Sequence, residues 1–350
     1  MNLSILKELV VSNFVDNANN EEERNSYQTC AFDFECINEI RISNLVKNQF
    51  NTVVRPFHFN IVNSHQFIML KDLNLNIISS PIKYVLLEYN LDLSKYQPLS
   101  HYLSTVEYPS VFLSTILDIY SKIISDLLEL EKMDICFFHV SANDILVDQN
   151  SNAILSDFKK SLFLESEEED YFMKVVQNIK SHTYKPIEIH LIHYLLKVND
   201  APLSYSSIDE ISIYFAENMD FLNHFGQEYK TKYYHDCVRH LKSKYLNKPK
   251  DYILNEIRRE SLKTWDNFAL SILFLHIFKN TIEVFSLNHT IINDLVLMLK
   301  QNLDPVPTER HTLSYTLNAL GDLLLKHQDW ASLRLIPKSK MKTLYERMVH

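Results

Sequence analysis

The sequence predicts an α+β protein with two lobes, a reduced β-rich N-terminal lobe (residues 1–88) and a helical C-terminal lobe (residues 89–350). Strand-like apolar runs dominate the first ninety positions, whereas after Pro109 apolar residues recur at spacings of three and four. At 350 residues and 46% hydrophobic, the chain is long enough to bury one large core or two lobes that share a cleft.

In the N-terminal lobe, the segments CAFDF, TVVRPFHFNIV, QFIML and KYVLLEYNL predict strands, and INEIRISNLVKNQF predicts a short helix. The strand KYVLLEYNL ends in polar residues, so we expect a hinge near Glu88–Leu93. Two further short strands, DILV and AILS, are predicted on either side of the turn-forming segment DQNSN.

The helical lobe begins with SVFLSTILDIYSKIISDLLELEK, whose apolar positions predict one long and largely buried helix. These positions are Phe112, Ile116, Ile119, Ile123, Leu127 and Leu130. After DILV, AILS and an acidic segment, LESEEED, the pattern is helical to the end of the chain.

Composition argues against several classes of partner. The formal net charge is −9 and no run of Lys or Arg occurs, so we expect no nucleic-acid partner. No signal peptide and no run of 18 apolar residues is recognisable, so we expect no membrane association.

The four cysteines lack metal-ligand spacing, and we interpret them as small buried residues in a reducing compartment such as the cytoplasm.

Glycine is unusually rare, since only Gly226 and Gly321 occur. Glycine permits the close backbone approach and positive φ angles on which phosphate-binding loops depend. The first half of the chain therefore cannot carry a P-loop, a dinucleotide fingerprint or a glycine-rich kinase loop.

Six segments, in order, resemble the protein kinase family over nearly the whole C-terminal half. They are similar to the hinge and following helix, the catalytic loop, the metal-binding Asp-Phe-Gly, the Ala-Pro-Glu end of the activation segment, a buried helix beginning with an aspartate, and a late Arg-containing signature. The corresponding segments are YVLLEYNLDLSKYQPLSHYL, ICFFHVSANDILVD, AILSDFK, YKPIE, TWDNFALSILFLHIF and LMLKQNLDPVPTERHTLSYTLNAL. The resemblance implies a bilobal kinase-like fold.

The chain departs from ordinary kinases by a helical insertion at about residues 190–262. Kinases of large DNA viruses often carry a long insertion here. The resemblance therefore suggests a viral protein, which would lie in the host cytoplasm or in the virion.

On this resemblance, Asp157 occupies the position of the aspartate that binds the metal ion, and Lys159 replaces the following glycine. Asp157 could hold Mg²⁺, or it could form a salt bridge with Lys159 or Lys160 without metal. Alternatively, it simply ends a strand and caps a turn.

The catalytic loop is eroded. Asp144 falls on the second metal-ligand position, where its carboxylate could hold Mg²⁺. His139 falls on the catalytic aspartate, and Ser141 replaces the lysine that contacts the transferred phosphate. Phe137 and Phe138 take the His-Arg positions, and we expect them to pack in the core.

The N-terminal lobe departs further from the family. Asp33 falls where the lysine that binds ATP phosphates belongs, and Glu39 is the candidate for its glutamate partner. An acid at the lysine position would repel ATP phosphates. An active enzyme would need a substitute such as Lys47, Lys71 or Lys83.

The structural residues of the family are better preserved. Glu188 and Arg310 match a buried ion pair, and Asp266 matches the aspartate that accepts hydrogen bonds from the catalytic-loop backbone. Together these features predict a pseudokinase, a binding or regulatory module with no certain cofactor and with a protein partner such as another kinase or a viral or host protein. The alternative is an active, divergent Ser/Thr kinase that uses ATP and Mg²⁺ through Asp157 and Asp144. A third interpretation is an unrelated helical protein.

Two histidine pairs remain as weaker candidates for a zinc site. They are His190 with His193 and His235 with His240, each spaced so that both could share a helix face. No cysteine or carboxylate set accompanies either pair, so we interpret them as ordinary core or surface residues.

Overall fold

The computed structural model describes residues 26–31, 33–46, 56–62, 84–89, 92–105, 109–164, 169–177, 179, 184–198, 202–285 and 290–327. The protein is a mixed α and β structure in which helices predominate. It divides into two compact units. We call Met1–Pro98 with Asp144–Ser161 the sheet unit, and Leu99–Asn143 with Leu162–His350 the helical unit.

The sheet unit contains an antiparallel sheet of three strands in the order β1-β3-β2. Its strands are β1 (Ser26–Ala31), β2 (Pro56–Val62) and β3 (Tyr84–Tyr89), and helix α2 (Phe34–Val46) follows β1. Strands β2 and β3 lie within the segments TVVRPFHFNIV and KYVLLEYNL, as predicted. The predicted strand CAFDF is only partly correct, because β1 ends at Ala31 and α2 already begins at Phe34, before the segment predicted as a helix. The further predicted strand QFIML lies outside the described residues.

A second antiparallel sheet of the same unit has the order β4-β6-β7. The 3₁₀ turn η2 (Leu93–Lys95) precedes β4 (Tyr96–Pro98). Strands β6 (Ile145–Asp148) and β7 (Ala153–Leu155) form a hairpin, and the 3₁₀ turn η3 (Phe158–Lys160) follows β7. The carboxylate of Asp148 accepts hydrogen bonds of 2.8 Å from the backbone N–H groups of Asn150 and Asn152. This explains why DQNSN turns the chain between the two predicted strands.

The core of the sheet unit joins α2 to both sheets. Cys36, Leu87, Tyr89 and Ile154 are buried together, with Ile40, Leu93, Tyr96 and Leu146 packed against them. Cys36 is disulfide-bonded, which corrects the expectation that all four cysteines are reduced. Cys136 and Cys237, in the helical unit, are free and buried as expected.

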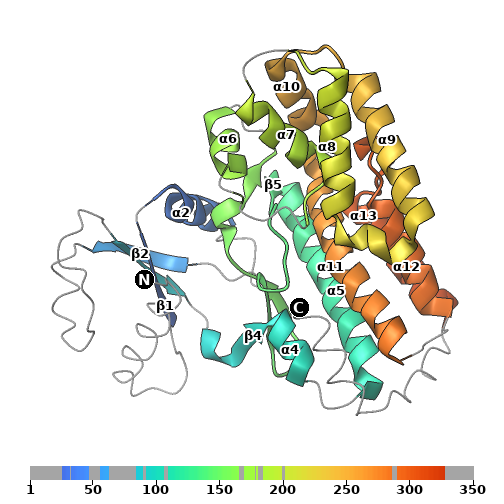
Figure 1. Ribbon diagram of the computed structural model, residues 1–350. Helices are drawn as coiled ribbons and strands as arrows, with labels where there is room; N and C mark the ends of the chain where they lie inside the picture. Colours follow the sequence, from blue (N-terminus) through green and yellow to red (C-terminus); the bar gives the residue numbers. More distant parts are fainter. Residues whose placement is uncertain are drawn as a thin grey trace, which may run out of the picture. The chain divides into compact units, whose positions relative to one another are not determined.

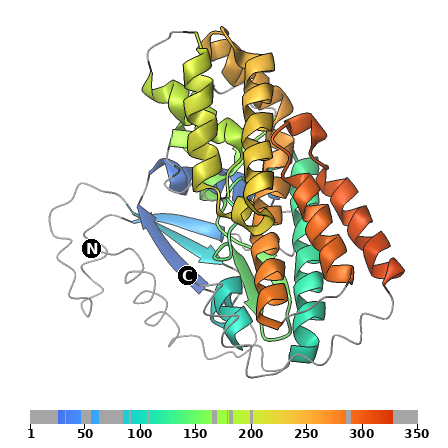
Figure 2. The same ribbon diagram turned by 45° about the vertical axis from the view of Figure 1, so that its right-hand side comes forward.

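The helical unit is built around α5 (Pro109–Lys132) and α11 (Leu262–Phe285), which lie side by side in both ribbon views (Figures 1 and 2). All six apolar residues of the predicted α5 stripe are at most 1% exposed. The other elements of this unit are α4 (Leu99–Thr105), β5 (Ile135–Cys136), β8 (Leu162–Phe163), α6 (Glu169–Gln177), α7 (Ile187–Lys197), α8 (Tyr205–Asn218), η4 (Asp220–Phe225), α9 (Gln227–Tyr245), α10 (Lys250–Glu260), α12 (Thr290–Asn302), η5 (Pro307–Glu309) and α13 (Leu313–Lys326).

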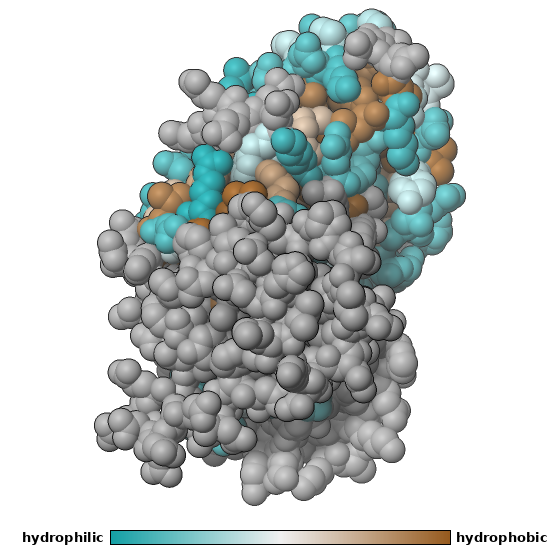
Figure 3. Space-filling view, turned by 90° about the vertical axis from the view of Figure 1, so that its left-hand side faces the viewer, coloured by the Kyte–Doolittle hydropathy of each residue, from teal (hydrophilic) through white to brown (hydrophobic). Residues whose placement is uncertain are grey.

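The predicted insertion is helical throughout its described part, since most of α7 and all of α8, η4, α9 and α10 lie in it. On the face shown in Figure 3, the described surface of the helical unit is mainly hydrophilic, with smaller hydrophobic areas between. None of the helices in the described ranges combines the length and the apolar character needed to cross a bilayer.

Truncation of the α5 stripe tests this core. Ile123 is fully buried, so Ile123→Ala should lower the free energy of unfolding by about 2–5 kcal/mol, because it removes apolar contacts and leaves a cavity. The same truncation at Ile213, which is 41% exposed on α8, should cost less than about 0.5 kcal/mol. Urea unfolding of the two variants beside the wild type measures both values, and equal losses would contradict the assignment of α5 to the core.

Candidate functional site

Helix α2 is fixed to the segment after β7 by one amide side chain. The Nδ2 group of Asn38 donates to the backbone carbonyls of Lys159 and Ser161 at 2.9 and 3.0 Å, and to that of Phe158 at 3.3 Å. Asn38 is 1% exposed. These contacts hold α2, which carries Glu39, against the segment that contains Asp157.

Asp157 ends a strand and caps a turn, which is one of the alternatives that the sequence left open. It follows β7 and caps η3 by accepting a hydrogen bond of 3.2 Å from the backbone N–H of Lys159, and its φ is +73°. Its carboxylate also lies 3.3 Å from the Lys159 Nζ atom. The carboxylate expected to bind metal therefore has the chain's own cation beside it.

Glu39 adds a second acid to this cluster. Burial lowers the pKa of Lys159, but the carboxylates of Asp157 and Glu39 outweigh that effect and raise it. Burial and the same two carboxylates also raise the pKa of Tyr89. Lys159 thus interacts with two acids. Its salt bridge with Asp157 is one of the alternatives that the sequence left open, whereas its interaction with Glu39 was not predicted.

Asp144 lies at the same end of the β6–β7 hairpin as Asp157. Its backbone carbonyl accepts hydrogen bonds from the N–H and hydroxyl of Ser156, at 2.9 and 3.2 Å. Ile145 pairs with Leu155 in the antiparallel hairpin, so Asp144, just before β6, and Asp157, two residues after β7, lie at the same end of the two strands. The two predicted metal-ligand positions are therefore brought to one edge of the sheet unit.

Asp33 lies beyond β1 and caps α2. Its carboxylate accepts a hydrogen bond of 3.0 Å from the backbone N–H of Cys36, and its side chain is exposed. The acid at the predicted lysine position therefore has a structural role. The substitute lysines, Lys47, Lys71 and Lys83, lie outside the described residues.

In the helical unit, Asp266 organises the turn that precedes His139. Its buried carboxylate accepts hydrogen bonds from the backbone N–H groups of Phe137 and Phe138, at 2.7 and 2.6 Å. This is the hydrogen bonding that we expected of Asp266. Both phenylalanines are at most 1% exposed, also as expected, and Phe138 has a φ of +68°.

Lys185 also contacts this turn, an interaction that the sequence analysis did not predict. Its ammonium group donates to the Phe138 carbonyl and lies 4.0 Å from the centre of the Phe138 ring. Burial raises the pKa of Asp266, whereas the two backbone hydrogen bonds and Lys185 lower it. The only signal in the sequence was a lysine directly before Pro-Ile-Glu, where the family has alanine.

Glu188 and Arg310 form the expected ion pair at 2.9 Å, and their side chains are at most 1% exposed. Arg310 also donates to Thr264 Oγ1 and to the backbone carbonyls of Asp304 and Pro305. Because three further guanidinium protons have acceptors beside the ion pair with Glu188, the buried charge is well solvated by the protein.

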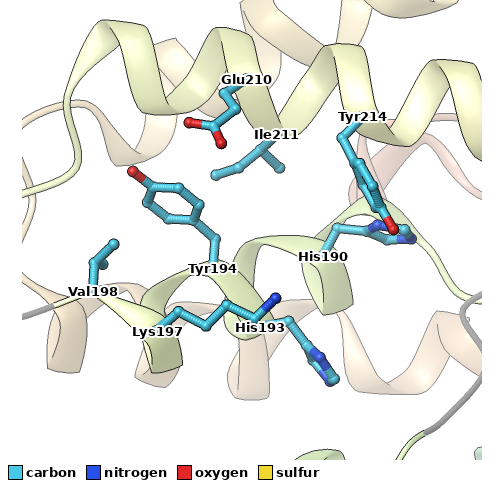
Figure 4. A pocket seen from close by; sticks show the side chains of 8 residues that line it. All are labelled: His190, His193, Tyr194, Lys197, Val198, Glu210, Ile211 and Tyr214. Carbon is cyan, nitrogen blue, oxygen red and sulfur yellow. The ribbon is translucent and has the colours of Figure 1, made fainter.

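A cavity of about 460 Å³ lies between α7 and α8 (Figure 4). Its lining residues are His190, His193, Tyr194, Lys197, Val198, Glu210, Ile211 and Tyr214. The volume is within the range of small-molecule pockets, but Lys197 and Glu210 are exposed and of opposite charge. The cavity therefore offers no concentrated positive charge for a nucleotide's phosphates.

The histidine pairs do not form metal sites in the part of the chain that the structure describes, where no group of three ligand-type residues converges. His190 packs against Tyr214 and Phe215, whereas His193 points away from α8 (Figure 4) and hydrogen-bonds the Val176 carbonyl at 2.9 Å. Burial lowers the pKa of His240 to about 4, with further lowering by Arg310 and Lys244.

The predicted site residues thus belong to two groups. Glu39, Asp144 and Asp157 belong to the sheet unit, where Lys159 joins them. His139 and the structural residues Glu188, Asp266 and Arg310 belong to the helical unit. Comparison with protein-family models found no match, and comparison with curated proteins found none.

The Glu188–Arg310 pair can be tested by removing one or both charges. Arg310→Met should lower the free energy of unfolding by about 3–5 kcal/mol, because it leaves the Glu188 carboxylate buried without its cation. The double variant Glu188→Leu with Arg310→Met should lose less than Arg310→Met alone. Chemical denaturation measures this double-mutant cycle, and additive losses would contradict a direct pair.

Proposed function

We propose that the chain is a pseudokinase, a kinase-like bilobal protein that acts as a binding or regulatory module and not as a phosphotransferase. Phosphoryl transfer needs metal ions positioned by carboxylates, a cation on the phosphates and a residue that orients the nucleophile. The proposal rests on how each of these needs would be met by the residues of this chain.

The observation that carries the proposal is the salt bridge between Lys159 and Asp157. A lysine amine 3.3 Å from this carboxylate competes with Mg²⁺ for its oxygens, and its positive charge repels the metal ion. Glu39, the candidate partner of an ATP-binding lysine, interacts with the same amine. The chain's own ammonium group therefore interacts with both carboxylates and offsets one of their two negative charges in the absence of metal or nucleotide.

Two further features support the loss of activity. Phe137 and Phe138 are buried in the core. On the resemblance to kinases, they stand where the family has His and Arg, and His139 stands where the family has the catalytic aspartate. The sequence also has no glycine before Gly226 with which to build a phosphate-binding loop. The hydrogen bonds of Asp266 and the Glu188–Arg310 pair preserve structure and not chemistry.

One observation favours the alternative of an active, divergent Ser/Thr kinase. The hairpin brings Asp144 and Asp157 to the same edge, and two carboxylates there could hold Mg²⁺ with ATP. In that case Lys159 would swing from Asp157 to the phosphates when nucleotide binds. The neutral imidazole of His139 would have to accept the proton of the substrate hydroxyl.

Nucleotide binding distinguishes the two proposals. With about 5 mM ATP and Mg²⁺ or Mn²⁺, ligand with a Kd of about 1 mM would stabilise the fold by about 1 kcal/mol, which raises the melting temperature by about 2 °C. For a pseudokinase in which Lys159 already pairs with Asp157, we expect no metal-dependent shift in the wild type. A metal-dependent shift that Asp157→Ala abolishes would overturn the proposal and favour the kinase.

A matched pair of glycine variants tests the role of Lys159. Lys159→Gly restores the residue that the family has at this position and frees the Asp157 carboxylate, so it should acquire a metal-dependent thermal shift. Lys160→Gly removes the neighbouring lysine, for which no ion pair is seen among the described residues, and should behave as the wild type. Equal behaviour of the two variants would show that Lys159 does not block the site.

A further inference from the structure

Two lysines of the helical unit, Lys279 and Lys300, lie over one pair of aromatic rings, and a third, Lys232, acts electrostatically on Lys300. Lys232 lies on α9, Lys279 on α11 and Lys300 on α12, and we call these three residues the lysine cluster. The rings are those of Phe225, the last residue of η4, and Tyr229 on α9, whose centroids are 4.9 Å apart. Helix α11 contacts both η4 and α12, and α9 also contacts η4, so the three helices meet at η4 (Figures 1 and 2).

Contacts with the rings hold two of the ammonium groups in place. The Lys279 Nζ atom lies 5.3 Å from the centre of the Phe225 ring, and the Lys300 Nζ atom lies 4.9 Å from the same centre. Lys300 also lies 3.9 Å from the centre of the Tyr229 ring. Such cation–π contacts favour one position of a lysine side chain that would otherwise be free to move, and so prepare the cations for a ligand.

The three cations are close enough to repel one another. Burial lowers the pKa of Lys300, and Lys232 and Lys279 lower it further. Within the described residues, no member of the cluster has a carboxylate within ion-pair distance. Three acids lie in the same region without forming such a pair. Asp220 acts on the pKa of His224, as Lys279 also does, and Asp304 and Asp236 act on the pKa of Tyr229.

Like charges held together without a direct ion-pair partner indicate a site for an anion, because a bound anion converts their repulsion into attraction. Several lysines elsewhere do have such partners. Lys159, Lys244 and Lys326 each have a carboxylate partner, and the net charge of −9 provides acids in excess. The cluster is a local exception to the acidic character of the protein.

We propose that Lys232, Lys279 and Lys300 bind a compact polyanion that carries more than one phosphate group. Ammonium groups are compact, strongly hydrated charges that suit phosphate oxygens, whereas planar carboxylates are better matched by arginine. The cations come from three different helices, so they can surround a ligand. Lys279 and Lys300 both contact the Phe225 ring, and two neighbouring cations suit several phosphates better than one.

An extended polyanion such as a nucleic-acid strand fits this surface less well. On α9, Glu228 and Asp236 lie one turn before and one turn after Lys232, so a strand that followed this helix would meet two carboxylates. The ring faces that could stack on bases also carry the ammonium groups of Lys279 and Lys300. A compact ligand avoids both obstacles.

Titration calorimetry of the full chain with sodium tripolyphosphate and with inositol hexakisphosphate tests the proposal. We expect binding that weakens as salt is raised from about 50 to 200 mM. The double variant Lys279→Met with Lys300→Met should lose at least about tenfold in affinity for each lysine removed, the worth of a charge-assisted hydrogen bond.

The matched control is Lys242→Met. Lys242 also lies on α9 and over an aromatic ring, with its Nζ atom 5.0 Å from the centre of the Tyr205 ring, but it is not part of the cluster. This variant should bind as the wild type does. The same loss in Lys242→Met and in the double variant, or no wild-type binding below about 1 mM at low salt, would overturn the proposal.

Two further experiments identify the source of the phosphates and test whether a nucleic-acid strand binds instead. Co-sedimentation with vesicles that contain phosphatidylinositol bisphosphate, lost in the double variant, would assign the site to a lipid headgroup. Binding of the soluble probe alone would assign it to a free polyphosphate. Tighter binding of a single-stranded oligonucleotide than of either probe would overturn the choice of a compact ligand.

This inference does not depend on the proposed pseudokinase function. ATP itself carries a polyphosphate, but a thermal shift that is lost in the double variant and retained in Asp157→Ala would arise from the lysine cluster. A shift with the opposite pattern would arise from the sheet unit. Each proposal can therefore fail without the other.

Discussion

The buried carboxylate of Asp266 is the interaction on which the helical unit most depends. A carboxylate taken out of water is stable only when hydrogen bonds and cations replace its hydration. The backbone N–H groups of Phe137 and Phe138 supply the hydrogen bonds, and Lys185 supplies positive charge. Asp266 lies in α11, and Phe137 and Phe138 come directly before His139 in the chain. The contact therefore fixes the start of the turn that contains His139 to helix α11.

The same requirement explains how the other buried charges are arranged. Glu188 meets Arg310, whose other protons have backbone and hydroxyl acceptors, so neither charge is isolated. In the sheet unit, Lys159 lies beside Asp157 and interacts with Glu39. A carboxylate that already has the chain's own cation beside it, as Asp157 has, gains less from binding a metal ion. This is the physical basis for proposing a module that has kept a fold and lost its chemistry.

In the lysine cluster, by contrast, no ion pair is formed within the described residues. Lys279 and Lys300 are held by Phe225 and Tyr229 in spite of the repulsion among the three lysines. A surface that keeps an unfavourable arrangement of charges is a better candidate for a ligand site than the cavity between α7 and α8, where Lys197 and Glu210 oppose each other across an open pocket (Figure 4). The ligand search should therefore begin at the lysines.

Local pattern determined much of this protein. The period of the apolar residues was enough to predict the α5 stripe, and alternation with turn residues was enough to predict β6 and β7, because both signals depend on neighbours in sequence. The scarcity of glycine likewise excluded a glycine-rich phosphate loop in the first half of the chain. The pairs Glu188–Arg310 and Asp266–Phe137 could be expected only because spaced motifs resembled a known family.

Tertiary structure alone decided which charges meet. Neither spacing nor composition could bring Lys159 to Glu39, Lys185 to Phe138, or Lys279 and Lys300 to Phe225, because these partners are distant in sequence and no local signal records the contact. Electrostatic energy depends on separation in space and on burial, and both are set only when the helices and strands have packed. The sequence determined the elements and the missing loop, and packing determined the charge pairs from which function is inferred.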